Sequence, residues 1–143
     1  MKISTVAVGL DGSATAAKAV EMAAELTRRF DGTLVLLSAF RDLKVAPASP
    51  ASDSAELQWA TNSSARTREI LARTEARLRR EGINCSTMIG EGDPADVLVK
   101  LAAQSGADVL VVGNRGMQRR LLGSVPNTVT HNAACSVLVV KTT

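Results

Sequence analysis

Short, nearly uninterrupted apolar segments alternate along the chain with longer segments in which apolar residues recur every three or four positions. The short segments predict strands at residues 3–9, 33–40, 83–89, 107–112 and 136–141. The longer segments predict helices from Ser13 to Phe30, 56–81, from Pro94 to near Gly106, and from Ser124 to about Ala133. Strands that alternate with helices pair in parallel through right-handed crossovers. The pattern therefore predicts an α/β fold, a doubly wound five-stranded parallel sheet with helices on both faces.

Residues with special backbone chemistry stand where these elements should begin and end. Ser13 is suited to cap the first helix, and Asp31-Gly32 to end it. Asp93-Pro94 has the form of an N-cap followed by proline at the first helical position. The stretch 42–55 carries two prolines among alanine and serine and is expected to be a surface loop, while Gly82 ends the long helix that follows it.

The composition of the chain narrows the function classes. Apolar residues make up 45% of the 143 positions, yet the aromatic residues are only two Phe, one Trp and no Tyr. Binding of single-stranded nucleic acid by base stacking needs exposed aromatic rings, so we expect no nucleic-acid partner. The longest aliphatic runs, 34–37 and 109–112, are far too short to span a membrane. Met1 leads into a strand without signal-peptide features. We expect one cytoplasmic domain over residues 1–143, with no membrane partner.

The net charge of +3 is concentrated in two groups of arginines. Six of them lie between Arg66 and Arg80 and are interleaved with glutamates, as on a solvated helix face. The second group, Arg115, Arg119 and Arg120, contains no acidic residue and lies in a glycine-bearing loop, which favours a phosphate partner. The two cysteines, Cys85 and Cys135, have neither CxxC spacing nor a histidine nearby, so we expect buried apolar thiols rather than a disulfide or metal site.

Two strand ends carry chemistry that the fold does not demand. Asp11-Gly12-Ser13 follows the first strand, and Gly113-Asn114-Arg115-Gly116 follows the fourth, with Gly123-Ser124 further on. Glycines let backbone N–H groups approach a phosphate, and a helix that begins at Ser124 would add unpaired donors and positive potential. In a doubly wound sheet, ligands bind where the strand order reverses. If the first and fourth strands are neighbours, both loops face one crevice.

Three motifs together resemble the universal stress protein family: Asp11-Gly12-Ser13, Gly92-Asp93-Pro94, and the loop from Gly113 to Ser124. The resemblance extends over essentially the whole chain. It implies a fold like that of the adenine nucleotide alpha hydrolases and binding of an adenine nucleotide: ATP, AMP or cyclic AMP, with Mg²⁺ accompanying ATP. It also implies a regulatory stress-response protein rather than an enzyme, and a homodimer formed through the strand Ser136 to Lys141.

The resemblance also implies which residues hold the nucleotide. Asp11 would contact the nucleoside, and the main chain near Ala39 and Phe40 would meet the adenine. Glycines 113, 116 and 123, with Ser124, would surround the ribose and phosphates. The complete set of expected binding residues is Leu10, Asp11, Ala39, Phe40, Val112, Gly113, Arg115, Gly116, Gly123, Ser124 and Val125. From the residues alone, Asp11 could equally serve as an ordinary Asp-Gly turn.

One departure from the family pattern leaves alternatives open. ATP-binding members have the motif G-x2-G-x9-G-[ST], whereas here only six residues separate Gly116 from Gly123, three fewer. The short loop favours an alternative in which the chain has lost nucleotide binding and acts as a dimeric interaction module. A phosphotransferase or nucleotide hydrolase is the other alternative. His131 is the single histidine, and no general base is evident beside the loop, so catalysis is not expected.

Overall fold

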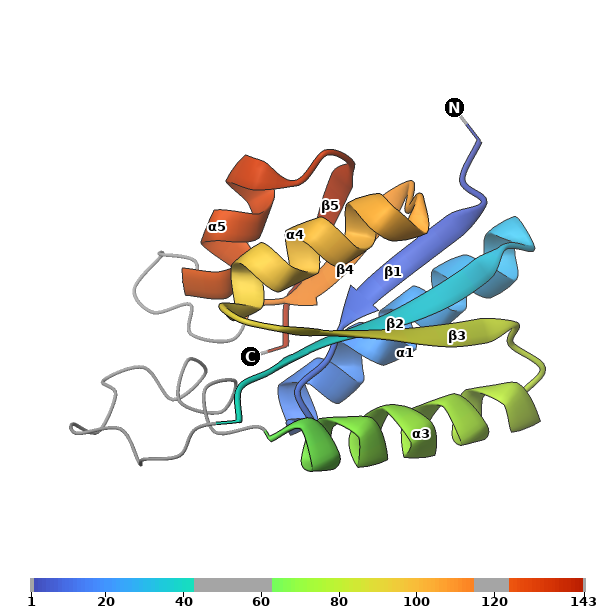
Figure 1. Cartoon of the computed structure of the whole chain (residues 1–143). Helices are drawn as coiled ribbons and strands as arrows, with labels where there is room; N and C mark the ends of the chain where they lie inside the picture. The colour runs from blue at the N-terminus through green and yellow to red at the C-terminus, as the bar shows by residue number, and fades with distance from the viewer. Residues whose placement is uncertain (1, 43–62, 115–123, 143) are drawn as a thin grey trace.

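The computed structural model describes residues 2–42, 63–114 and 124–142, which form one parallel sheet flanked by helices (Figure 1). In chain order the elements are β1 (Thr5–Gly9), α1 (Ala14–Phe30), β2 (Thr33–Phe40), α3 (Ser64–Arg80), β3 (Cys85–Glu91), α4 (Pro94–Ser105), β4 (Val109–Gly113), α5 (Ser124–Asn132) and β5 (Ser136–Val140). The strands lie side by side in the order β3-β2-β1-β4-β5, and every pairing is parallel. The predicted doubly wound sheet is confirmed.

Helices cover both faces of the sheet, so the central strands are buried on both sides (Figure 1). Helices α1 and α3 pack on one face against Val6, Val8, Leu34 and Leu36. Helices α4 and α5 pack on the other face, against alternate residues of the same strands such as Ala7, Val35 and Leu37. Successive side chains of a strand point to opposite faces. This two-sided burial is why these strands have continuous rather than alternating apolar sequences.

The helix termini follow the chemistry of the capping residues. The Ser13 Oγ accepts the N–H of Ala16 at 3.2 Å, and an Asp93 carboxylate oxygen accepts that of Asp96 at 3.3 Å. Asp31 ends α1 in the left-handed conformation, with φ of 52°. These capping predictions are confirmed. At the N-termini a short polar side chain accepts from backbone N–H groups that the helix leaves unpaired, and at the end of α1 the backbone N–H of Asp31 donates to a carbonyl of the last turn.

The predicted helix 56–81 is not continuous, because it is interrupted at Ser63. Helix α3 begins at Ser64, because Ser63 has an extended backbone and its Oγ accepts the Arg66 N–H at 3.2 Å. The Asp42 carboxylate accepts the N–H of Ser64 at 2.8 Å. The helix was predicted across Ser63 because it was inferred from the spacing of apolar residues alone, which does not reveal an N-cap. Positions 56–62, and most of the loop expected at 42–55, lie outside the described residues.

Three strands start two residues later than predicted. Strand β1 begins at Thr5 rather than at residue 3. For β3 and β4, the residues before the strand serve the preceding helix ends. The Ile83 N–H donates to Leu78 O at 3.0 Å, and β3 then runs from Cys85 to Glu91. The Ala107 N–H donates to Ala102 O at 3.1 Å, and β4 then begins at Val109.

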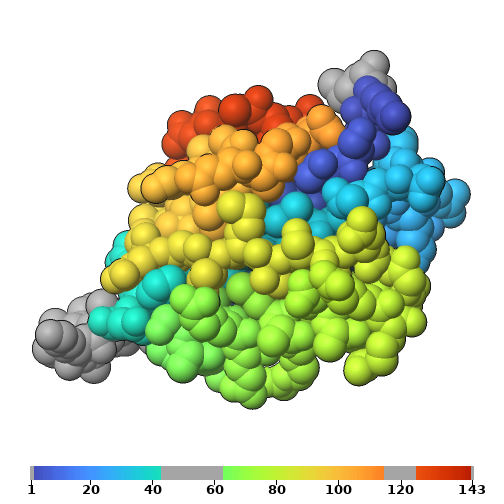
Figure 2. Space-filling view, turned by 45° about the vertical axis from the view of Figure 1, so that its right-hand side comes forward, coloured from blue at the N-terminus to red at the C-terminus, as the bar shows by residue number. Residues whose placement is uncertain are grey.

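The two outer strands of the sheet are β3 and β5. Figure 2 shows the β3 edge between α3, in green, and α4, in orange.

At the start of the sheet an Asp108 carboxylate oxygen accepts the N–H groups of Ser4 and Thr5 at 2.8 and 3.0 Å. The bonds from Thr5 and Ser4 lower the pKa of this carboxyl below its usual value. Cys85 is buried and Cys135 half-buried, both as free thiols. Within the described ranges, no helix is long and apolar enough to cross a bilayer.

Candidate functional site

A crevice lies at the carboxyl ends of β1 and β4, where the strand order reverses. The two strands are neighbours in the sheet, whereas the helices that follow them, α1 and α5, cover opposite faces. The crevice is lined by Gly9, Asp11, Ser13, Thr15, Ala16, Leu98, Val112, Gly113, Val125 and Pro126, and its volume is about 40 Å³. The described residues thus form the base of a site, at the place where doubly wound sheets bind ligands.

The β1 wall of the crevice is a turn held by the chain's own hydrogen bonds. The Leu10 N–H donates to Leu37 O at 3.0 Å, and the Ser38 hydroxyl donates to Leu10 O at 2.5 Å. Asp11 is only 2% exposed, and its Oδ1 accepts the Ser13 N–H at 2.9 Å. The Asx-type bond fixes the carboxylate at the strand end. The side chain of Asp11 is therefore both part of the turn and part of the crevice lining.

Glycine is required at position 12 by the backbone. Its φ is +86°, a conformation that residues with a Cβ rarely adopt. A Cβ there would also lie 2.7 Å from Ile70 Cδ1, on α3. The turn can therefore pass between the sheet and α3 only with glycine at this point.

In the β4 wall, neither the backbone conformation nor packing against the described residues requires glycine at position 113. Gly113 does not have a positive φ, and a Cβ added to it would lie 3.6 Å from Thr142 Cγ2 and from Thr15 O, which is ordinary contact. Among the described residues, nothing would obstruct alanine at this position. A glycine in a crevice wall that these residues do not require leaves the backbone open to close approach by a ligand.

Asn114, the next residue, is 2% exposed and joins β4 to the C-terminal residues. Its Oδ1 accepts both the N–H and the hydroxyl of Thr142, at 2.9 and 2.8 Å. Its Nδ2 has no hydrogen-bond partner within the described ranges. A buried amide donor without a partner is unfavourable by about 1–3 kcal/mol, so the end of β4 has unused hydrogen-bonding capacity.

The remaining sides of the crevice come from α4 and α5. A Cβ at Gly9 would lie 2.9 Å from Leu98 Cδ1, so α4 packs directly on the end of β1. Helix α5 begins at Ser124 and contributes Val125 and Pro126 to the crevice lining. The free N–H groups of a helix N-terminus favour an anion. The crevice thus combines an apolar side with a helix start.

The structure brings together four of the sequence-predicted residues as crevice lining: Asp11, Val112, Gly113 and Val125. Ser124 starts α5 next to them. Leu10 is buried and lines a neighbouring groove instead. Arg115, Gly116 and Gly123 lie outside the described residues.

Ala39 and Phe40 end β2 and do not line the crevice. Ala39 is buried in the core, and the Phe40 carbonyl accepts the Gly92 N–H at 3.1 Å. Whether their main chain meets a base stays a prediction. Sequence reasoning placed the loop that contains Ser13 at the crevice but missed other lining residues: Gly9, Thr15, Ala16, Leu98 and Pro126. Thr15 and Ala16 directly follow the turn after β1, so a strand-end argument could have included them. Leu98 carries no signal beyond its place on the apolar side of α4.

The parallel sheet, with a crevice where the strand order reverses, defines a doubly wound α/β protein. Within that class the chain matches the model of the universal stress protein family over residues 2–141. The chain belongs to the universal stress protein family. The predicted resemblance is confirmed.

Individual relatives agree with this assignment. Universal stress protein Rv1636 of Mycobacterium tuberculosis is 37% identical over 143 residues, and the match covers 97% of both proteins. A universal stress protein whose crystal structure was solved in complex with cAMP is 30% identical and superposes with a TM-score of 0.77, covering all of both chains. UspA from Lactobacillus plantarum is 25% identical, with a TM-score of 0.74 over 98% of this chain and 99% of its own.

Proposed function

We propose that this protein binds an adenine nucleotide in the switch-point crevice and acts as a regulatory universal stress protein. The observation that supports this most is Gly113, a glycine in the crevice wall that packing against the described residues does not require. The cAMP complex of a relative that is 30% identical over the whole chain supports the class of ligand. ATP and AMP are further candidates, with Mg²⁺ accompanying the triphosphate.

Each wall has a distinct role in this proposal. The buried Asp11 carboxylate accepts hydrogen bonds from the sugar hydroxyls. Gly113 lets its backbone approach the ribose and first phosphate, and the N-terminus of α5 at Ser124 faces the anion. Val112 and Val125 supply apolar contact. Arg115 and glycines 116 and 123 complete the proposed binding residues from the loop between β4 and α5.

We propose regulation rather than catalysis as the output of binding. Efficient phosphoryl transfer needs a base or a positioned water in line with the phosphate. His131 is exposed in the last turn of α5, nine residues long, and so stands at the opposite end from the helix start that faces the crevice. Membership of the universal stress protein family supports the same assignment.

The test is calorimetric titration of the full chain with cAMP, AMP and ATP, together with mass spectrometry of any nucleotide released when the purified protein is denatured. We expect at least one of the three to bind with a Kd below about 100 μM, which corresponds to roughly 5.5 kcal/mol. Gly113→Val should abolish that binding, and circular dichroism of this variant checks that the fold is retained. Ala72→Val, at an exposed position of α3 away from the crevice, is the control and should bind as the unmodified protein does. Failure of all three nucleotides to bind at about 1 mM would refute the proposal.

A second candidate function is a protein-interaction module without a nucleotide. The small crevice volume of about 40 Å³ favours it, because small-molecule sites usually enclose roughly 300–1,000 Å³. The short stretch between Gly116 and Gly123 favours it as well. Absence of nucleotide binding, with retention of dimerisation, would establish this alternative in place of the first.

Under either candidate we propose a homodimer formed through β5. This strand lies at the sheet edge, and its three central residues, Val137, Leu138 and Val139, are only half-buried. An apolar edge strand offers unpaired backbone groups to a second copy. Val139→Asp should give a folded, largely monomeric protein by light scattering, while Ser136→Asp, at the exposed start of the same strand, should remain dimeric. A dimeric Val139→Asp protein would exclude this interface.

A further inference from the structure

A cavity larger than the crevice lies beside it, between α1 and α3. Its volume is about 400 Å³, within the range of roughly 300–1,000 Å³ that small-molecule sites occupy. The floor is apolar and consists mainly of Leu10, Ala16, Val20 and Ile70. We call this cavity the α1–α3 groove.

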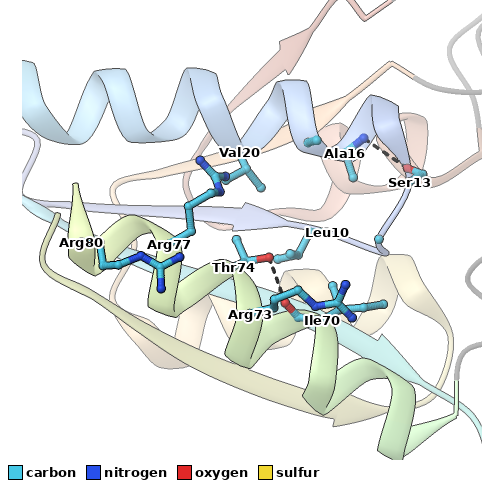
Figure 3. Close-up of a pocket in the computed structure, with 11 residues that line it drawn as sticks. Leu10, Ser13, Ala16, Val20, Ile70, Arg73, Thr74, Arg77 and Arg80 are labelled. Carbon is cyan, nitrogen blue, oxygen red and sulfur yellow. Dashed lines mark hydrogen bonds between the residues drawn. The ribbon is translucent and has the colours of Figure 1, made fainter. Parts of the chain in front are cut away.

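The charged residues of the groove are all cations. Arg73, Arg77 and Arg80 line it from α3, and none of the described lining residues is acidic. Figure 3 shows these three side chains along α3 on the side of α1, with Arg77 and Arg80 at the end of the groove near Val20 and with Ser13 and Ile70 toward the other end. Arg73 lies beside Ile70, so only Arg77 and Arg80 form a cationic end (Figure 3). An apolar groove with this cationic end is complementary to a molecule with an aliphatic body and an anionic head.

The arginines differ in how well the chain satisfies them. Arg73 pairs with Glu69 at 2.8 Å, at the exposed surface. Arg77 lies 3.5 Å from Glu81, which is also 3.7 Å from Arg28. No carboxylate lies within ion-pair distance of Arg80 among the residues that the structure places. The cation with no partner is therefore at the same end of the groove as the weakly paired one.

The hydroxyl groups of the groove are already used by the helices. The Ser13 Oγ accepts the Ala16 N–H, and the Thr74 hydroxyl donates to Ile70 O at 2.8 Å (Figure 3). The arginines would therefore determine which ligand binds, and the apolar floor would supply the contact area. A neutral polar ligand such as a sugar would find few unpaired partners here.

We propose that the α1–α3 groove binds an aliphatic monocarboxylate, a medium-chain fatty acid. The carboxylate lies between Arg77 and Arg80, where a guanidinium can form two parallel hydrogen bonds with it. The aliphatic tail of the fatty acid lies along Val20, Leu10 and Ile70 toward Gly12. This site is separate from the proposed nucleotide crevice and does not depend on it, although Ser13 and Ala16 line both.

Decanoate is the probe, added to the full-length protein and followed by isothermal calorimetry and by chemical shifts of groove methyl groups. We expect saturable binding of one decanoate per chain and none of decyltrimethylammonium, which has the same tail and the opposite charge. Arg80→Gln should weaken decanoate binding about fivefold to tenfold, as expected for loss of a charge-assisted hydrogen bond, and Arg80→Lys should restore part of it. Arg68→Gln removes the same charge from α3 outside the groove and should have no effect.

A second pair of variants tests the cavity itself. Ala17 is exposed on α1 and lines the groove, so Ala17→Leu fills the cavity without changing the core. It should abolish decanoate binding and leave AMP binding unchanged. Ala72→Leu, at an exposed position of α3 outside the groove, is the matched control.

Three results would overturn the proposal: no decanoate binding at about 1 mM, equal binding by Ala17→Leu and the unmodified protein, or equal binding of the cationic analogue. If Ala17→Leu or Arg80→Gln changes the oligomeric state and decanoate does not bind, the groove is an interface between two copies instead. Loss of nucleotide binding alone, with decanoate binding intact, would refute the proposed function and leave this inference standing.

Discussion

The two walls of the switch-point crevice differ in how far the chain itself explains them. In the β1 wall, Asp11 closes a turn onto the Ser13 N–H, and Gly12 has a φ that only glycine adopts readily. In the β4 wall, Gly113 is neither strained nor crowded, and the buried Asn114 Nδ2 has no partner in the part of the chain that the structure describes. The conformation of the β1 wall is explained by the requirements of its turn, whereas the described residues do not explain Gly113 and the Asn114 Nδ2 in the β4 wall.

This difference separates two meanings of a glycine in a loop. Gly12 is required by the backbone, so its presence would be expected in a protein without any ligand. Gly113 is not required by its backbone conformation or by packing against the described residues, so a ligand that approaches from outside is the better explanation of its presence. The β4 wall is therefore the stronger argument for a ligand, although the aspartate of the β1 wall is chemically more conspicuous.

The largest expected effect is on stability at Gly12. Gly12→Ala places a Cβ at positive φ and 2.7 Å from the Ile70 side chain, and we expect the free energy of unfolding to fall by about 2–3 kcal/mol. Gly113→Ala should change it by less than about 1 kcal/mol, because the new Cβ makes only ordinary contacts. Urea denaturation of both variants measures the two values. Equal losses would remove the contrast between the walls.

The same variants should rank in the opposite order for ligand binding. Gly113→Ala should weaken AMP binding at least about tenfold, or ~1.4 kcal/mol. The added methyl group occupies the space in which AMP would contact the protein backbone at this position. Gly12→Ala, measured well below its unfolding temperature, should weaken it less. Calorimetry in which Gly113→Ala binds AMP as the unmodified protein does would show that this glycine has no role in binding.

Asp11 tests whether the β1 wall has a second role beyond its turn. Asp11→Ala should weaken AMP and ATP binding by similar factors, about 1–3 kcal/mol, because its proposed partner is the nucleoside that both share. Asp11→Asn keeps an oxygen that can accept the Ser13 N–H and so serves as the control for the turn. A loss confined to ATP would place Asp11 near the outer phosphates.

The sequence was sufficient for the fold because its signals were local and repeated. Continuous apolar strands such as 34–37, capped helices, and the order of elements together predict a doubly wound sheet, and the observed strand order confirms it. The start of α3 was missed because its signal was a single serine, Ser63, inside a stretch with acceptable helical periodicity. Capping by one side chain outweighed the pattern.

The site was predictable only in part. Asp11 and Gly113 were identifiable because residues at neighbouring strand ends converge in space. Leu98, in contrast, comes from the middle of α4 and reaches the crevice only through helix–sheet packing against Gly9. The α1–α3 groove was not predicted either, since its arginines had the sequence pattern of a solvated helix face. Three-dimensional packing decides which side of α3 each of them occupies.

The smallest expected effect concerns the outer phosphates of ATP. In ATP-binding members of the family, the loop motif has three more residues than the six between Gly116 and Gly123 here, so the outermost phosphate should lack a backbone contact or two. A charge-assisted hydrogen bond contributes roughly 1.5–3 kcal/mol, and ~1.4 kcal/mol corresponds to a tenfold change in affinity. Arg119 and Arg120 can offset part of this loss, although exposed ion pairs are weak and screened by salt.

We expect ATP to bind less than about tenfold more tightly than AMP, and insertion of three residues after Met117 to raise only the ATP affinity. Competition titrations measure both ratios, and a preference for ATP of about a hundredfold in the unmodified protein would show that the β4 wall holds a triphosphate with the loop as it is.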